Sequence, residues 1–210
     1  MGLPSVSAIV LAAGVSERMG AQNKLLLDYG GKPLVTHVVD TILGAGLDEV
    51  VVVLGHESER VRHALADHPV AFAVNDRFTE GMTTSIHAGL LAAREDAIGY
   101  MICLADLPLI ESWELEVLIE AFHAANHSDE RHIVVPFYQG QRGNPVVFPA
   151  HYKPEILAEQ GLTGCRGLVK QHRDLVVEVK METDHVLTDV DTPQEWSAVS
   201  PHHDPRSTYE

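Results

Sequence analysis

The stretch AIVLAAGVSERMGAQNK (residues 8–24) joins an apolar run directly to a glycine and two cations. The apolar part predicts a buried β-strand that ends at Gly14. Ser16 then adds a hydroxyl group, and Arg18 and Lys24 add positive charge. A glycine-containing loop exposes backbone amides, and cationic side chains donate charge-assisted hydrogen bonds to anions. The spacing is neither G-x-G-x-x-G nor a Walker A loop, yet it predicts an anion-binding loop behind a strand.

The rest of the chain alternates between short runs rich in β-branched residues and helical patterns. Strands are expected at 7–13, 49–55, 70–75, 99–105, 132–138, 144–149 and 174–181. Helices are expected at 33–46, 57–67, 83–95, 112–126 and 192–199. Continuous apolar strands that alternate with helices indicate a mostly parallel sheet covered on both faces. The two strands around the turn QGQRG (139–143) break the alternation, which predicts a mixed sheet. We expect an α/β protein with one domain over 1–199 and a flexible tail at 200–210.

The composition is that of an ordinary globular protein. The 210 residues are 45% hydrophobic and 21% charged, and the net charge is −15. A duplex nucleic-acid binder normally has a basic face, so this balance argues against nucleic acid as a partner. A small anionic substrate remains compatible with it where cations cluster locally.

Other features limit the location of the protein and its metal chemistry. No apolar stretch reaches the roughly 20 residues that a membrane-spanning helix needs, and we expect a cytoplasmic protein with no membrane partner. The two cysteines, Cys103 and Cys165, lack metal-ligand spacing. His123 and His127 would share a helix face, but a solvated helix end explains them more simply than a metal site.

Carboxylates follow two of the later segments. In open α/β sheets, ligands bind beyond the carboxyl ends of the strands. Asp106 ends an apolar strand and suits Mg²⁺, which takes one or two protein carboxylates together with substrate phosphates. A turn or cap carboxylate is the alternative. Asp189 and Asp191 would point to the same side of an extended segment, although Asp191 could instead cap the helix that begins at 192.

Three glycine-containing segments add candidate binding residues. Gly81 permits close backbone approach, and Ser85 or its neighbours could bond a base or ribose; a plain helix cap by Thr83 or Thr84 is the alternative. The loops GQRGNP (140–145) and GLTGCRG (161–167) carry Arg142 and Arg166, which could contact an anionic second substrate. Flexible surface loops would explain them equally well. Ser112 could serve as a simple cap for its helix.

Together these segments resemble the MobA-like NTP transferase family over about residues 7–198. LAAGVSERMGAQNK looks like the family signature L-A-[AG]-G-x-S-x-R-M-G-x(2,3)-K, EGMTTSIHAGL like E-G-M-x-x-S-x-x-A-G-L, and LADLPLI like its D-x-P metal strand. GNPVVF, GCRGL and DVDTPQEW resemble later segments of the molybdopterin cytidylyltransferase branch. The resemblance implies a three-layer, Rossmann-like nucleotidyltransferase fold with a mostly parallel mixed sheet. Ala13, where the guanylyltransferase branch usually has glycine, favours CTP.

The resemblance also implies residue roles. Arg18, Lys24 and Asp106 would be catalytic. The nucleotide would meet Leu11, Ala12, Ala13, Gly14, Ser16, Arg18, Lys24, Asn75, Gly81 and Ser85. Mg²⁺, the implied cofactor, would be bound by Asp106 with Asp191 or Asp189. The acceptor would lie against Gly143, Asn144 and Pro145.

The implied reaction is nucleotidyl transfer from CTP to molybdopterin carrying molybdenum, with release of pyrophosphate and with a molybdoenzyme as a possible recipient. The nearest alternative is the same chemistry with GTP, or with a sugar phosphate or polyol phosphate acceptor. A second is a non-catalytic chaperone that hands the molybdenum cofactor to an enzyme. A third is a dinucleotide-binding oxidoreductase, against which the missing G-x-G-x-x-G counts.

Overall fold

The computed structural model describes residues 6–20, 22–127, 131–161 and 164–201. Its centre is an eight-stranded sheet in the order β3-β2-β1-β4-β7-β5-β6, with β8 also paired to β5. Strands β1 to β4 are parallel, and β5 and β8 run in the same direction, whereas β6 and β7 are reversed. The strands are β1 (Val6–Ala12), β2 (Glu49–Leu54), β3 (Ala71–Val74), β4 (Gly99–Leu104), β5 (Ile133–Tyr138), β6 (Gln141–Arg142), β7 (Val146–Pro149) and β8 (Val176–Lys180).

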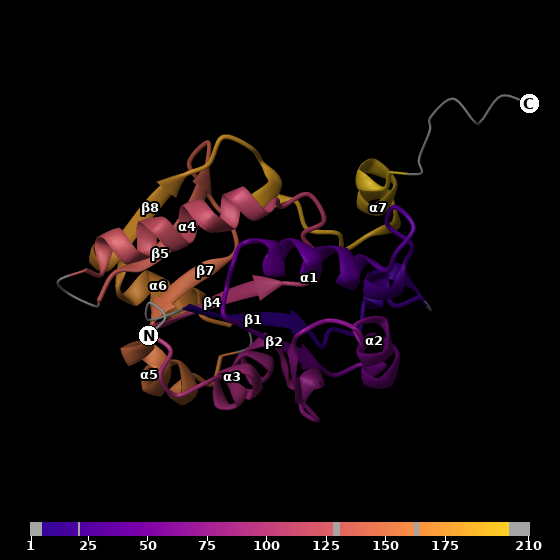
Figure 1. The fold of residues 1–210 in the computed structure, drawn as a ribbon, viewed down its shortest axis with the longest axis horizontal. Coiled ribbons are helices and arrows are strands. Elements are labelled where there is room, and N and C mark those ends of the chain that lie inside the picture. The colour runs from indigo at the N-terminus through magenta and orange to yellow at the C-terminus, as the bar shows by residue number, and fades with distance from the viewer. Residues whose placement is uncertain (1–5, 21, 128–130, 162–163, 202–210) are drawn as a thin grey trace, which may run out of the picture.

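Helices cover both faces of this sheet and make three layers. One core contains buried residues of α1 (Leu34–Gly44), α2 (Ser58–Ala64) and α4 (Ser112–Ala125). The other contains those of α3 (Met82–Ala92), α5 (Lys153–Ala158) and α6 (Arg166–Gln171). Figure 1 shows α1 and α4 above the sheet and α3 and α5 below it. The expected α/β class with a mostly parallel mixed sheet is therefore confirmed.

The central strand explains why the first apolar run is continuous. Ala8, Val10 and Ala12 belong to the core under α1, whereas Ile9 and Ala13 belong to the core under α3. Alternate residues of a strand point to opposite faces, so a strand covered on both faces needs apolar residues throughout. Leu11 is in register with both Val53 of β2 and Leu104 of β4, so these three strands end at the same edge.

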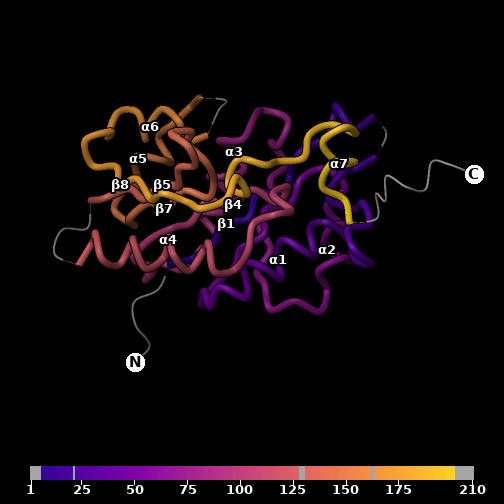
Figure 2. The backbone as a smooth tube through the Cα atoms, turned by 90° about the horizontal axis from the view of Figure 1, so that it is seen from above, coloured from indigo at the N-terminus to yellow at the C-terminus, as the bar shows by residue number. Residues whose placement is uncertain are grey.

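The chain returns to this edge at its C-terminal end. After β8 it crosses the sheet toward α7 (Pro193–Val199), which lies beside the N-terminal part of the chain (Figure 2). The rings of Tyr29 and Trp196 meet there with centroids 6.0 Å apart. This return brings residues almost 170 positions apart in sequence into contact.

The expected helices and strands are present, with ends that differ by up to a few residues. The helix starts agree to within one residue, but the caps of α3 and α4 differ from the expectation. Gly81 (φ 110°) takes the N-cap position of α3, so neither Thr83 nor Thr84 caps that helix. Glu111 caps α4 in a capping box with Glu114, and Ser112 instead donates a hydrogen bond to the Thr41 carbonyl (2.8 Å).

The sequence reading missed β6, α5 and α6. β6 has two residues, and α5 and α6 have six each, too short for a clear period. Of the expected tail at 200–210, residues 202–210 lie outside the described part of the chain. Among the described residues, no helix combines the length and apolar character needed to cross a membrane.

Candidate active site

The candidate site lies at the edge where β1 and β4 end. The Ala105 amide donates to the Leu11 carbonyl (3.3 Å), which ties the two strand ends together. The Val190 amide donates to the Asp106 carbonyl (3.0 Å). This bond places the returning segment that contains Asp191 along the end of β4. The edge therefore combines three distant parts of the sequence.

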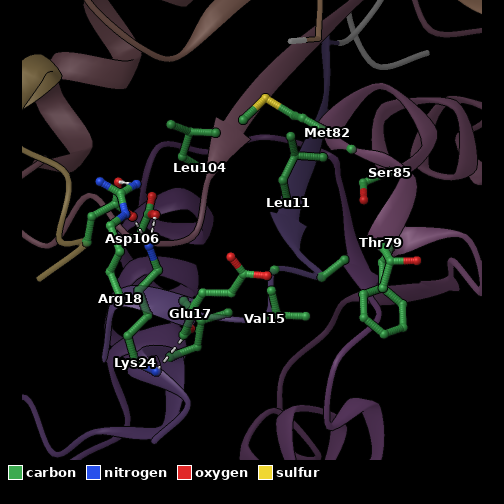
Figure 3. Close-up of a pocket in the computed structure, with 17 residues that line it drawn as sticks. Leu11, Val15, Glu17, Arg18, Lys24, Thr79, Met82, Ser85, Leu104 and Asp106 are labelled. Atoms are coloured by element: carbon green, nitrogen blue, oxygen red, sulfur yellow. Dashed lines mark hydrogen bonds and ion pairs between the residues drawn. The ribbon is translucent and has the colours of Figure 1, made fainter. Parts of the chain in front are cut away.

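A compact group of charged side chains lies at this edge. Lys24 Nζ donates to Asp106 Oδ2 (2.5 Å) and to Asp191 Oδ1 (2.7 Å). Arg18 Nη2 forms an ion pair with Asp191 Oδ2. The Lys24 side chain is 10% exposed and that of Arg18 is 67% exposed. Lys24 thus forms the buried centre of the group, and Arg18 closes it from the solvent side (Figure 3).

These contacts determine the charge states. Burial lowers the pKa of Lys24, but Asp106 and Asp191 outweigh burial and raise it above its ordinary value. Burial raises the pKa of Asp191, but Lys24 and Arg18 outweigh it and lower the pKa. The pKa of Asp189 is raised by burial and by the negative charges of Asp106 and Asp191. Lys24 and Asp191 are therefore both ionised at neutral pH.

The Asp191 carboxylate is available because another residue caps α7. The Thr192 hydroxyl accepts a hydrogen bond from the Glu195 amide (3.3 Å). The Glu195 carboxylate accepts hydrogen bonds from the amides of Asp191 and Thr192, each at 2.8 Å. The alternative that Asp191 caps this helix is therefore wrong. The carboxylate of Asp191 faces Lys24 and Arg18 instead.

Asp106 has an oxygen that fits a divalent cation. Its Oδ1 is buried and has no hydrogen-bond partner within the described residues. A buried carboxylate oxygen without a partner is costly, and carboxylate oxygens are the ligands that Mg²⁺ prefers. Asp106 and Asp191 could hold such an ion together, because Lys24 Nζ already contacts an oxygen of each.

No larger metal cluster accompanies these two carboxylates. Across residues 6–20, 22–127, 131–161 and 164–201, no three or more His, Cys, Asp or Glu side chains are grouped to hold a metal. His123 and His127 fall within this search and form no such cluster. A site with one or two protein carboxylates suits an ion whose other ligands come from substrate phosphates and water.

A cavity of about 420 Å³ opens beside the charged group (Figure 3). A Cβ added to Gly14 would meet no atom within 4 Å, so the missing side chain leaves space for a ligand rather than for packing. Gly81, at φ 110°, is in a conformation that favours glycine. The cavity is lined by Leu11, Ala13, Gly14, Val15, Ser16, Glu17, Arg18, Lys24, Leu25, Phe78, Thr79, Gly81, Met82, Ser85, Leu104, Asp106 and Asp191.

Three residues expected at the nucleotide or metal do not line this cavity. Ala12 is buried in the core that contains α1 residues. Asn75 is 5% exposed, and its Nδ2 donates to the hydroxyls of Thr84 and Ser85, each at 2.9 Å. Asn75 therefore positions Ser85, which does line the cavity. Asp189 precedes Asp191 on the returning segment and lies outside the lining.

The sequence reading missed several lining residues. Four of them form uncharged parts of the cavity wall: Phe78, Thr79, Met82 and Leu104. Leu104 could have been found because it is the last residue of β4 and lies two positions before Asp106. Met82 stands in the quoted segment EGMTTSIHAGL, whereas nothing in the local pattern distinguishes Phe78 and Thr79.

A second cavity of about 380 Å³ adjoins the first and shares Met82 and Leu104 with it. Two of the three expected acceptor residues, Gly143 and Asn144, line it, whereas Pro145 does not. The full lining is Met82, Ile86, Ile102, Leu104, Arg142, Gly143, Asn144, Val146, Phe148, Cys165 and Arg166. Most of the residues expected at the nucleotide and at the acceptor thus line two neighbouring cavities.

Known proteins resemble this chain in sequence. The family model described as MobA-like NTP transferase domain matches residues 8–176. Nicotine blue oxidoreductase of Paenarthrobacter nicotinovorans is 29% identical over 195 residues, which are 92% of this chain and 95% of that protein. The bifunctional protein GlmU of Listeria monocytogenes is 36% identical over 117 residues, which are 55% of this chain and only 25% of GlmU.

Solved structures show the same fold. Rv0371c from Mycobacterium tuberculosis H37Rv has a TM-score of 0.82 and 27% identity, covering 94% of this chain and 98% of that one. A complex of Rv0371c with manganese has a TM-score of 0.78 and 26% identity, covering 94% of this chain and 99% of that one. The likeness extends over almost the whole length of both proteins.

Proposed function

The chain belongs to the MobA-like NTP transferase domain family and is a nucleotidyltransferase, and from that premise we propose that it transfers CMP from CTP to molybdopterin carrying molybdenum. The observation that supports this most is the contact of Lys24 with Asp106 and Asp191 beside a cavity that Gly14 leaves open. Cations, carboxylates and an exposed backbone loop are what a nucleoside triphosphate with a divalent cation requires. Ala13 favours CTP within the family.

The proposed roles follow from the lining of the first cavity. The backbone of Leu11, Ala13 and Gly14, together with Ser16, Gly81 and Ser85, would contact the nucleotide. Arg18 and Lys24 would bind the triphosphate. Asp106 with Asp191 would hold Mg²⁺, which supplies charge neutralisation at phosphate oxygens when bound. Ala12, Asn75 and Asp189 would support these groups from behind rather than contact the ligand.

The proposed reaction is a single displacement. An oxygen of the acceptor phosphate attacks the α-phosphorus of CTP, and the bond from that phosphorus to the bridging oxygen breaks. Pyrophosphate leaves with the bond's electron pair, and no bond to the protein forms. Such chemistry depends on positioning and on neutralising charge. Lys24 and Arg18 would stabilise the negative charge that develops on the leaving pyrophosphate.

The acceptor would occupy the second cavity. Gly143 and Asn144 line it, and Pro145 follows them directly before β7. The loop is held firmly, because the Asn144 amide donates to the Val186 carbonyl (2.9 Å) and a Cβ on Gly143 would lie 2.6 Å from the same oxygen. A molybdoenzyme that receives the product belongs to this proposal.

An oxidoreductase is the second candidate, and one finding favours it. Nicotine blue oxidoreductase matches 92% of this chain. Against it, the loop after β1 lacks G-x-G-x-x-G, the dinucleotide-binding pattern. Oxidation of NADH or NADPH with nicotine blue as the acceptor, followed by absorbance, would distinguish the two activities.

The direct test of the proposal is a panel of CTP, GTP, ATP and UTP with Mg²⁺, each with and without molybdopterin carrying molybdenum. We expect pyrophosphate release with CTP that depends on the acceptor. Release with GTP, or with a sugar phosphate or polyol phosphate acceptor, would replace the proposed substrates but keep the chemistry. Cofactor binding without pyrophosphate release from any nucleotide would favour a chaperone and contradict the proposal.

A further inference from the structure

The second cavity contains two cations that have no anionic partner within the described part of the chain. Arg142 is half-buried and Arg166 is exposed. Neither guanidinium has a hydrogen bond or an ion pair with another described residue. The described residues that line the cavity include no Asp or Glu. In a chain with a net charge of −15, a cavity with two cations and no acid is an unusual local concentration of positive charge.

The positive charges of Arg142 and Arg166 also repel each other. The pKa of Arg142 is lowered by burial and by the positive charge of Arg166. The Cys165 thiol adds no negative charge at neutral pH, because burial and the nearby Glu159 carboxylate raise its pKa to about 12. A half-buried cation beside a like charge is unfavourable until an anion neutralises it.

The fold holds both arginines in place. Arg142 pairs with Phe137 in the β5–β6 hairpin, and the next residue, Gly143, donates its amide to the Pro136 carbonyl (2.8 Å). The loop before Arg166 is tied to α3, because the Gly164 amide donates to the Thr83 hydroxyl (3.1 Å). The two guanidinium groups therefore extend from two separate segments of the chain, and the backbone of each segment is held in place.

The remaining wall of the cavity is largely apolar. Its apolar side chains come from α3, β4 and β7: Met82, Ile86, Ile102, Leu104, Val146 and Phe148. A volume of about 380 Å³ suits a small-molecule body. Met82 and Leu104 also line the first cavity, so a ligand here would lie next to the nucleotide.

We propose that Arg142 and Arg166 are specificity-determining residues that bind a phosphate of the acceptor, while the apolar wall holds the acceptor's body. This inference rests on the proposed function and deepens it. A phosphate monoester carries a charge of about −1.5 to −2 at pH 7, which matches the two cations. Each planar guanidinium can donate two parallel hydrogen bonds to phosphate oxygens.

The test uses 2-naphthyl phosphate and the uncharged 2-naphthol as matched probes, followed by fluorescence. The first cavity is filled with Mg²⁺ and α,β-methylene-CTP, which cannot transfer its nucleotidyl group. We expect the wild type to bind the phosphate at least about tenfold more tightly than the alcohol. Arg142→Gln and Arg166→Gln should each weaken binding of the phosphate by about tenfold or more and leave binding of the alcohol unchanged.

Arg173→Gln is the matched control, because its side chain is 83% exposed and lies outside both cavities. Unchanged affinity of each variant for the CTP analogue shows that the variant is folded. Equal binding of phosphate and alcohol by the wild type would overturn the inference, as would wild-type affinity in both variants.

The proposed function and this inference fail separately. A wild type that does not bind the CTP analogue contradicts the proposed function. Binding of the two naphthyl probes to the second cavity is then measured without the analogue. A wild type that binds the analogue but does not prefer the phosphate probe contradicts only the inference about Arg142 and Arg166.

Discussion

The two neighbouring cavities treat their positive charges in opposite ways. In the first, Lys24 and Arg18 are paired with Asp106 and Asp191. In the second, Arg142 and Arg166 have no partner among the described residues, and no carboxylate lines the wall. Cations that are paired with carboxylates are already neutralised without a ligand, and they must exchange these partners when a ligand binds. Unpaired cations gain their first strong partner from the ligand itself.

The difference follows from which elements build each cavity. The first lies where parallel β1 and β4 end, and the returning segment adds Asp191 to the Asp106 already there. The second is built from β4, the reversed β6 and β7, α3 and the start of α6, and none of these contributes an acid to the lining. We expect the first cavity to control the reaction and the second to control the choice of acceptor.

The largest expected effect is on catalysis in the first cavity. Lys24→Met should lower the rate of pyrophosphate release by about 100-fold or more, because it removes a preorganised cation from the leaving group. Lys32→Met is the control, since Lys32 pairs with Asp40 away from both cavities. Near wild-type turnover in Lys24→Met would break the distinction between the cavities.

The next effect concerns space in the first cavity. Gly14→Val should weaken binding of the CTP analogue by about tenfold or more, since the added side chain would fill the space left for the ligand. Binding of 2-naphthyl phosphate to the second cavity should not change. Isothermal titration measures both, with Gly167→Ala as a control at a glycine whose added Cβ also meets nothing within 4 Å. Equal losses for both ligands would mean that the two cavities act as one.

A smaller effect is expected from the cap that frees Asp191. Thr192→Ala should lower the free energy of unfolding by about 1 kcal/mol, because the Glu195 amide loses its acceptor. Urea denaturation followed by circular dichroism measures it. Ser197→Ala, in the same helix, should be close to neutral, since alanine favours a helix interior. Equal stability of Thr192→Ala and the wild type would show that the cap contributes nothing.

The smallest expected effect is on metal binding, and it tests whether Lys24 and a metal ion compete for Asp106 and Asp191. Without nucleotide, Lys24→Met should bind Mn²⁺ about threefold more tightly, because the ammonium group no longer competes for Asp106 and Asp191. Electron paramagnetic resonance of free Mn²⁺ reports the affinity, and Asp106→Asn should weaken it. Weaker metal binding in Lys24→Met would mean that Lys24 supports the metal site rather than competing with it.

Local patterns predicted most of the fold and the charged part of the site. The alternation of apolar strands and helices predicted the sheet, since a strand buried on both faces must be apolar throughout. The capping residues were less predictable than the helix starts, because Gly81 and Glu111 took cap positions assigned to their neighbours. The one-domain organisation over 1–199 and the residue roles at the substrates stay predictions.

The sequence by itself determined the α/β class, the loop with Arg18 and Lys24 behind the first strand, and the acids at Asp106 and Asp191. Only the tertiary structure decided which charges are paired. Asp191 meets Lys24 although 167 positions separate them in sequence, whereas Arg142 and Arg166 meet no acid among the residues that the structure describes. The physical reason is that local preference acts over a few residues, whereas charge pairing depends on where the whole chain returns.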